Sequence, residues 1–557
     1  MGGLAGRYSS ARKLPGVAAL VLVFALAAIV YSQYGLDYGL SRDNAVTLYS
    51  GQRMAEGVPP YVSIFDNRGP LAPMLAGLGV TLANYLNTED IYTVRVVFFL
   101  LGCSTVVSVY LLGSNLLQSR RVGAFAAFTF LGFQSFAQYA ASGPEPKVPM
   151  VLFQVLSLLL TGRKRWFWAG VCGSLSFLVW QPMAIFPLVT LFLAAVQPAG
   201  SKLSAVFRTV AGAGLPTLAI GAYFYARGAL YELISGGILF HVRYLDPANQ
   251  EQSSFVSHLT RPAREILEGY PTMLTPIVVG LAMVVCFYFL RRSVQGSFRG
   301  VVARDAFAPI LLSFPFPVVW SLLDFQGYDD FYVFLPYVAV GFAVFLDLAV
   351  ARVEDAYGTA LRGRGGQVLV AGLCLALVAA AGIGSAAEID TPQQPAVQES
   401  NGLLIQKRTA LKIRERFGED AKLVSIGSPQ LLALLHRTNP NPYAFIIRGI
   451  DRQIDSQTRG GFEGWLEELQ EYDPDVIAFG KTKGVHKQEL VSWLNARYRR
   501  VKVGPWDLYV KPRLLPERSS ILSEENGHAG VSGSRPTIGK VAAGTPLEHA
   551  EAGENDA

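Results

Sequence analysis

The side chains best suited to chemistry lie in the polar segment that follows the first apolar stretch of the chain. Within residues 37–70, Asp43, Asp66 and Arg68 alternate with aromatic residues and with Gly and Pro. A membrane anchor needs none of these charges, and a short linker would be enough to join two spans. A long, charged and aromatic-rich segment at the bilayer surface predicts a site for a ligand with a polar head and a lipid tail.

Further polar side chains lie in connections that the predicted topology brings to the same membrane face. The short turn Gly-Pro-Glu-Pro-Lys holds Glu145 and Lys147, and Gln181 follows Trp180 at a hairpin between two spans. Arg243 lies in a longer loop. Charges at a membrane boundary are costly unless they are solvated, paired or lining a cavity, so these positions are candidates for function.

The alternative for each of these charges is an ordinary solvated loop position. That alternative is favoured for three aspartates before a late apolar run, Asp324, Asp329 and Asp330. It is less favoured for Glu145 and Lys147, because so short a turn must lie at the mouth of a helix bundle.

Composition places the chain among membrane proteins. It has 557 residues, of which 51% are hydrophobic and 16% are charged, whereas a soluble domain carries about 25% charged residues. Apolar segments of about 17–25 residues can cross a bilayer. We predict an α-helical polytopic membrane protein with about eleven transmembrane helices in residues 1–390. The predicted spans are 14–32, 91–115, 122–140, 147–161, 166–180, 182–197, 205–226, 271–290, 306–323, 330–349 and 367–387.

Lys and Arg residues in short loops set the predicted orientation. Six basic clusters all fall on the cytoplasmic side if the N-terminus is cytoplasmic and eleven spans follow. This places a large first loop, residues 33–90, and everything after residue 388 outside, with the apolar run 70–86 along the outer interface. The net charge of +6 is therefore explained by topology and predicts no nucleic-acid partner.

A different composition begins after the last apolar segment. Residues 398–513 predict a small α/β domain on the extracytoplasmic side, and residues 514–557, rich in Gly, Ser, Glu and Pro, predict a disordered tail. Strands of the domain are expected at 422–427, at 474–479 and on both sides of Gly504. The four cysteines show no metal-ligand spacing.

The segments SRDNAVTLY and GQRMAEGVPPYVSIFDNRGPLAP resemble the start of GT-C fold glycosyltransferases. Among these enzymes, the chain is most similar to the dolichyl-phosphate-mannose mannosyltransferase group, whose members are also described as protein mannosyltransferase-like or glycosyltransferase 39-like. That group has an acidic residue after its first span, then Gly-x-Pro-Tyr and Phe-x-Asp-Lys-x-Pro. Here Asp43 is the acidic residue, and Arg68 stands where Lys is common. Further matches at Arg95, at Glu145 and in YDDFYVFLPY extend the resemblance over about residues 14–350.

The resemblance implies a membrane enzyme that moves a sugar, with mannose as the family's sugar, from a polyprenyl or dolichyl phosphate to an acceptor hydroxyl. Transfer would invert the sugar, with Asp43 as general base and Glu145 as a second catalytic carboxylate. The acceptor, a glycan, a lipid-linked molecule or a protein, is left open, as is a divalent metal shared by the two carboxylates. No cofactor is assigned. Contacts with the donor phosphate or substrate are assigned to Asp66, Arg68, Lys147, Gln181 and Arg243.

Two other classes compete with this interpretation. A transporter or flippase of lipid-linked or small polar substrates is the main alternative. The sequence lacks a pair of Gly- or Pro-broken helices in matching halves, and its polar residues gather at one membrane face. A non-catalytic scaffold is the other alternative, with the α/β domain as its binding module.

Overall fold

The structure of the protein is a computed structural model. It describes residues 16–197, 200–244, 255–294, 302, 306–323, 325, 327–357, 364–390, 402–447 and 449–515. Residues 516–557, most of the predicted disordered tail, and Asp324 lie outside these residues.

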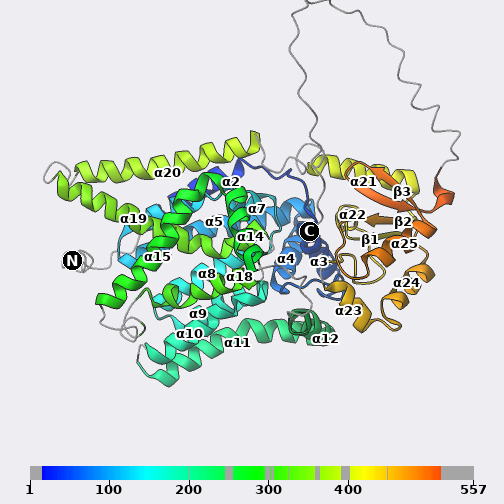
Figure 1. Cartoon of the computed structure of the whole chain (residues 1–557), viewed down its shortest axis with the longest axis horizontal. Helices are drawn as coiled ribbons and strands as arrows, with labels where there is room; N and C mark the ends of the chain where they lie inside the picture. Colours follow the sequence, from blue (N-terminus) through cyan, green and yellow to red (C-terminus); the bar gives the residue numbers. More distant parts are fainter. Residues whose placement is uncertain are drawn as a thin grey trace, which may run out of the picture. The chain divides into compact units, whose positions relative to one another are not determined.

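Each of the eleven apolar segments predicted as spans coincides with one or more helices (Figure 1). These helices are α2 (Val17–Ser32), α5 (Asp90–Leu117), α6 (Arg120–Leu131) with α7 (Gln134–Ser142), α8 (Lys147–Gly162), α9 (Trp166–Val179), η1 (Gln181–Ala184) with α10 (Ile185–Val196), α11 (Lys202–Ala226), η4 (Pro271–Met273) with α15 (Leu274–Val294), α17 (Ala308–Ser313) with α18 (Pro315–Leu323), η5 (Tyr328–Phe334) with α19 (Leu335–Ala356), and α20 (Arg364–Asp390).

Length and composition make the chain an integral membrane protein. In the part of the chain that the structure describes, five helical segments are long and apolar enough to cross a membrane, and several shorter apolar helices accompany them. The count of eleven spans stays a prediction. The five long segments are Asp90–Leu117, Lys202–Ala226, Pro271–Phe289, Tyr328–Ala356 and Gly365–Ala387.

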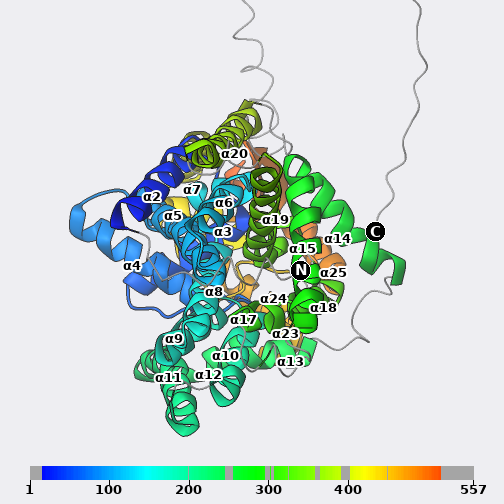
Figure 2. The ribbon, with the colours of Figure 1, turned by 90° about the vertical axis from the view of Figure 1, so that its left-hand side faces the viewer.

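Helix α5 lies at the centre of the packing among these helices. It packs against α6 and α8, while α6 in turn packs against α19, and α8 against α9 (Figure 2). The contact between α6 and α19 includes a charged link, because Arg121 Nε lies 2.5 Å from Asp347 and its Nη1 lies 2.9 Å from Glu354. The helices are therefore joined into one body that can hold short connections in fixed places.

The segment 33–90, predicted as a loop, contains two helices, α3 (Arg42–Ala55) and α4 (Leu71–Leu86), which pack against each other. Helix α3 begins after Ser41, whose hydroxyl accepts the backbone N–H of Asn44 at 3.1 Å and so caps the helix. Most of its apolar side chains, including Tyr49, are buried. The run 70–86 is thus helical as expected, and its place along the membrane interface stays a prediction.

The segment between α11 and α15 is also largely helical where the structure describes it. Its elements are α12 (Leu230–Ile234), the π-helix η2 (Ser235–Leu239), α13 (Phe240–Tyr244) and α14 (Phe255–Gly269).

The C-terminal region forms the expected small α/β unit around a four-stranded sheet with strand order β1-β2-β4-β3 (Figure 1). Strands β1 and β2 are parallel, with Leu423 opposite Val476, and the other pairs are antiparallel. All four strands fall where the sequence predicts them. The elements are α21 (Leu403–Phe417), β1 (Leu423–Ile426), α22 (Gln430–Leu435), α23 (Ile450–Gln457), α24 (Gly461–Tyr472), β2 (Val476–Phe479), α25 (Lys487–Arg497), β3 (Arg499–Val503) and β4 (Trp506–Val510). The short helix η8 (Pro512–Leu514) follows in the chain and belongs to a separate unit.

The core of this region is shared with the membrane part of the chain. Trp465, Val424 and Ile477 are buried in one apolar cluster that also contains Phe65 and Phe240. Phe65 belongs to the segment between α3 and α4, and Phe240 belongs to α13. The α/β region therefore packs directly on the polar segment that carries the candidate site.

Candidate active site

Asp43 lies in the first turn of α3, where the Ser41 cap fixes the direction of the helix. Its side chain is 49% exposed, so its carboxylate is open to a ligand. Two arginines lie beside it. Oδ2 is 3.6 Å from Arg68 Nη2, and Oδ1 is 3.8 Å from Arg42 Nε.

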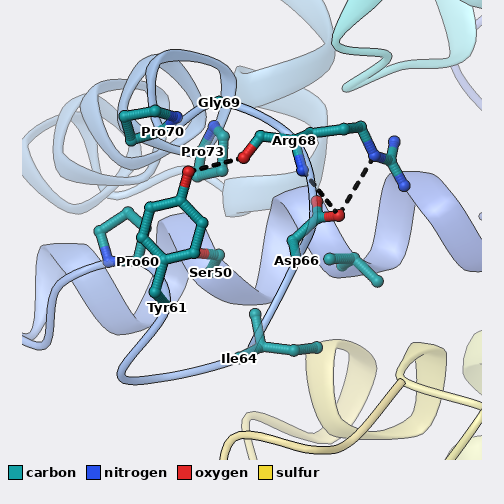
Figure 3. Close-up of a pocket in the computed structure, with 10 residues that line it drawn as sticks. Ser50, Pro60, Tyr61, Ile64, Asp66, Arg68, Gly69, Pro70 and Pro73 are labelled. Carbon is teal, nitrogen blue, oxygen red and sulfur yellow. Dashed lines mark hydrogen bonds and ion pairs between the residues drawn. The ribbon is translucent and has the colours of Figure 1, made fainter. Parts of the chain in front are cut away.

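The turn between α3 and α4 positions Arg68. Tyr61 has a left-handed backbone with φ of 67°, and its hydroxyl donates to the backbone oxygen of Arg68 at 2.6 Å (Figure 3). Asp66 Oδ1 accepts from the backbone N–H of Arg68 at 3.4 Å and from its Nε at 3.3 Å. At Gly69 a Cβ would lie 2.1 Å from the backbone oxygen of Leu178, so only glycine lets the turn approach α9 this closely.

A small pocket opens beside this turn, against the face of α3 that carries Val46 and Ser50 (Figure 3). Asp66 and the backbone around Arg68 form one side of it, and prolines form another. The residues lining it are Val46, Ser50, Pro60, Tyr61, Ile64, Asp66, Arg68, Gly69, Pro70 and Pro73. We call Asp43, Asp66 and Arg68 the Arg68 cluster.

A second group of charges surrounds Lys147 at the start of α8. Its Nζ lies 2.5 Å from Asp329 and 2.5 Å from Asp330, both in η5, and 5.4 Å from the centre of the Trp180 ring. Glu145 is 5% exposed, and its Oε1 accepts the backbone N–H of Lys147 at 3.3 Å. We call Glu145, Lys147, Asp329 and Asp330 the Lys147 cluster.

Burial sets the protonation of Glu145. Loss of hydration raises its pKa to about 7, and the charge of Asp329 acts in the same direction. The positive charges of Lys147 and Arg68 oppose this rise. Near neutral pH Glu145 is therefore divided between its protonated and ionised forms.

The two clusters act on each other electrostatically. Burial alone would lower the pKa of Arg68, but the carboxylates of Asp66 and Asp43 raise it above its usual range. Glu145 and Asp329 raise the pKa of Arg68 further. Arg68 therefore stays charged and lies within the field of both clusters.

Three other residues singled out in the sequence have different surroundings. Gln181 donates from Nε2 to the backbone oxygens of Asn67 and Gly237, each at 3.2 Å, and so holds the turn that carries Arg68. Arg243 is exposed in α13 and, among the described residues, takes no part in the ion pairs of either cluster. Arg95 is buried and donates to the backbone oxygens of Gly143 and Leu36, so it ties the Glu145 turn to the segment before α3.

The structure gives a paired role to two residues that sequence reasoning assigned to solvated loops, Asp329 and Asp330. Both contact Lys147, which lies about 180 residues away in the chain. The signal available in the sequence was two adjacent acids at the start of a long apolar run, a position where charges need partners.

A shared divalent metal stays a prediction. Among the residues that the structure describes, no group of three or more His, Cys, Asp and Glu side chains is arranged to hold a metal ion.

Comparison with known proteins points to one class. Residues 57–220 match the family model described as DolP-mannose mannosyltransferase. The fold is similar to that of ArnT from Cupriavidus metallidurans in the apo state, with a TM-score of 0.54 and 11% identity over 90% of this chain and 99% of that chain. It is also similar to the oligosaccharyltransferase of Archaeoglobus fulgidus, with a TM-score of 0.50 and 14% identity over 82% of this chain and 67% of that chain. No curated protein matches this chain in sequence.

These likenesses show the fold, which is the GT-C fold of membrane glycosyltransferases. With the mannosyltransferase family match, they identify the chain as an integral-membrane glycosyltransferase. Nothing in the comparisons favours the transporter alternative. The family match includes Arg68, Glu145, Lys147 and Gln181, whereas Asp43 lies before it.

Proposed function

We propose that this enzyme transfers mannose from a polyprenyl or dolichyl phosphate to an acceptor hydroxyl, with Asp43 as general base and Arg68 as the main contact of the donor phosphate. The family description supports the donor and the sugar, because it names dolichyl-phosphate mannose. The observation that carries the assignment of residues is the pair formed by an open carboxylate and a charged guanidinium 3.6 Å away.

Exposure makes Asp43 the better base. A general base must come within hydrogen-bond reach of the proton that it removes, and the carboxylate of Asp43 is 49% exposed. Glu145 is 5% exposed, and its pKa of about 7 leaves part of it protonated at neutral pH. Glu145 therefore suits orientation of a substrate hydroxyl, as acceptor or donor, better than removal of a proton.

Arg68 has the geometry to stabilise the leaving group. Its guanidinium has five N–H donors in a planar fork that matches phosphate oxygens. Asp66 and Asp43 engage only part of this fork, through Nε and Nη2. Lys147 is less suited to this role, because Asp329 and Asp330 already balance its charge. Its assignment to the phosphate, like that of Arg243, stays a prediction.

The reaction is a single displacement. The acceptor oxygen attacks the anomeric carbon as its proton passes to the Asp43 carboxylate. The bond between the anomeric carbon and the phosphate oxygen breaks, and its electron pair leaves with the polyprenyl phosphate beside Arg68. Attack opposite the leaving group inverts the anomeric centre. We place this site on the extracytoplasmic face, because that orientation leaves the basic clusters of the sequence in the cytoplasm.

A reconstituted assay tests the proposal. Purified protein in liposomes is given polyprenyl-phosphate mannose and a set of glycan and peptide acceptors, and products are scored by mass spectrometry. We expect mannosylated product with the inverted linkage from the wild type and a large loss with Asp43→Asn. Transfer of a solute across the liposomes without any glycosidic product would overturn the proposal. Labelling of a cysteine placed at Glu468, an exposed residue of α24, but not at Arg163, from outside intact cells tests the orientation; the reverse pattern would contradict it.

A further inference from the structure

Helix α3 is attached to the C-terminal α/β region along one face. Arg42 Nη1 donates to the backbone oxygen of Lys481 at 2.8 Å, at the start of the helix. Further along, the Tyr49 hydroxyl accepts the backbone N–H of Asn439 at 3.0 Å. Residues seven apart lie on nearly the same side of a helix, so Arg42 and Tyr49 present one surface to the α/β region.

The neighbouring face of α3 carries the candidate chemistry. Asp43, Val46 and Ser50 follow each other at spacings of three and four, which places them on one side of the helix. Val46 and Ser50 line the pocket beside Arg68. A rotation or shift of α3 against the α/β region would therefore move Asp43, together with this wall of the pocket, relative to Arg68.

Arg42 connects these two faces directly. Its guanidinium lies 4.8 Å from the centre of the ring of Phe445, a fully buried side chain of the α/β region. Its Nε lies 3.8 Å from Asp43 Oδ1. One side chain thus contacts the α/β region by a hydrogen bond to Lys481 and by its charge over an aromatic ring, and also faces the candidate base.

The distances around Asp43 suit a base. Arg42 and Arg68 approach different carboxylate oxygens at 3.8 and 3.6 Å, beyond ordinary hydrogen-bond length. At such distances two cations orient the carboxylate by charge without occupying its lone pairs. The carboxylate keeps an acceptor position for the proton of an incoming hydroxyl.

The segments on either side of α3 are attached to the same region. Leu40 and the Gln406 side chain exchange two hydrogen bonds, of 2.8 and 3.2 Å. The backbone N–H of Phe65 donates to the backbone oxygen of Pro442 at 2.7 Å, next to Asp66. The α/β region therefore holds the surroundings of both Asp43 and Arg68.

We propose that Arg42 is a positioning residue through which the C-terminal α/β region fixes the direction of the Asp43 carboxylate. The proposal rests on the assignment of Asp43 as the base. It gives the α/β region a part in the transfer step that is separate from any contact with the acceptor.

The central experiment compares Arg42→Met with Arg408→Met, which changes an exposed arginine of α21 in the full-length protein. Methionine keeps an aliphatic stem over Phe445 and removes the charge and the donor to Lys481. Because small displacements of a catalytic group are costly, we expect kcat to fall about tenfold or more with Arg42→Met. The KM for polyprenyl-phosphate mannose should stay unchanged within about twofold, since Arg68 is intact. Arg408→Met should match the wild type, and Arg42→Lys, which keeps a cation over Phe445, should recover most of kcat.

Two further variants make the outcome decisive. Phe445→Leu, a milder change within the α/β region, should lower kcat in the same direction even if Arg42→Met fails to fold. In an Asp43→Asn background, Arg42→Met should cause no further loss, because both changes act on the same carboxylate. An unchanged kcat for Arg42→Met, or additive losses in the double variant, would overturn the inference while Asp43 stays the base. If Asp43→Asn itself keeps normal turnover, the proposed function fails, whatever Arg42 does.

Discussion

The two charged clusters of this glycosyltransferase contain the same kinds of residue, but they differ in how closely their charges are paired. In the Arg68 cluster the carboxylate of Asp43 is open to solvent and stands at 3.6 Å from its cation. In the Lys147 cluster the side chain of Lys147 is only 11% exposed, and its amine contacts two carboxylates at 2.5 Å. A cation that is already paired at close range holds helices together, whereas a loosely paired and accessible carboxylate can exchange a proton with a substrate. Under the proposed function, this difference in pairing assigns proton transfer to Asp43 and assigns to Lys147 the joining of α8 to η5.

The largest expected effect is on the Arg68 cluster. Asp43→Asn keeps the size and hydrogen-bonding capacity of the side chain but removes the base, so the rate of transfer should fall by about 10²–10⁴-fold. Expression and donor binding should change little, since Asp66 still holds Arg68. Transfer rates and donor affinity measured on the same reconstituted samples check this. Near-normal turnover would mean that Asp43 is not the base, and Glu145 would then be the leading candidate.

The second largest effect is expected in the Lys147 cluster, as a lower free energy of unfolding. Lys147→Met leaves the carboxylates of Asp329 and Asp330 without their cation in a largely buried site, and breaking such a pair costs about 3–5 kcal/mol. Thermal unfolding in detergent should show a clear decrease in Tm. As a control, Lys147→Met combined with Asp330→Asn should recover part of it. A single Lys147→Met variant with normal Tm would mean that the cluster does not join α8 to η5.

Sequence reasoning found the eleven apolar segments and the four strands, because hydropathy and β-rich runs are local signals. It also singled out Glu145 and Lys147, because charges in a five-residue turn between two spans must lie at the mouth of the bundle; their assignment to the site stays a prediction. It missed α3, since the Gly, Pro and charged residues around it suggested a loop and its buried face contacts the α/β region. Sequence reasoning also missed Arg42, because its partner Lys481 lies 439 residues away in the chain. A contact between residues so far apart in the chain leaves no pattern in the sequence around either residue.

A smaller effect is expected in the pH dependence of stability, and it comes from Glu145 of the Lys147 cluster. The raised pKa means that Glu145 holds its proton more tightly in the folded protein than in the unfolded chain, where its value is near 4.5. The free energy of unfolding should therefore decrease as pH rises from about 4.5 to about 7, and level off above that. Glu145→Gln should remove this part of the pH dependence. Tm measured across pH 5 to 8 in both proteins checks the sign, and an unchanged slope in the variant would argue against burial as the cause.

The smallest effect should come from Asp66, which belongs to the Arg68 cluster but has no assigned proton transfer. In the wild-type protein, Asp66 Oδ1 lies 3.4 Å from the backbone nitrogen of Arg68 and 3.3 Å from its Nε. Asp66→Asn keeps an oxygen that can accept both hydrogen bonds and removes the negative charge. Weakening such a hydrogen bond costs about 0.5–1.5 kcal/mol, or roughly 2–10-fold in an equilibrium constant. Because Arg68 is the proposed contact of the donor phosphate, the loss should appear as a higher KM for the lipid donor, with kcat nearly unchanged. A loss confined to kcat would instead place Asp66 beside Asp43 in the chemical step, and the Arg68 cluster would then contain two catalytic carboxylates.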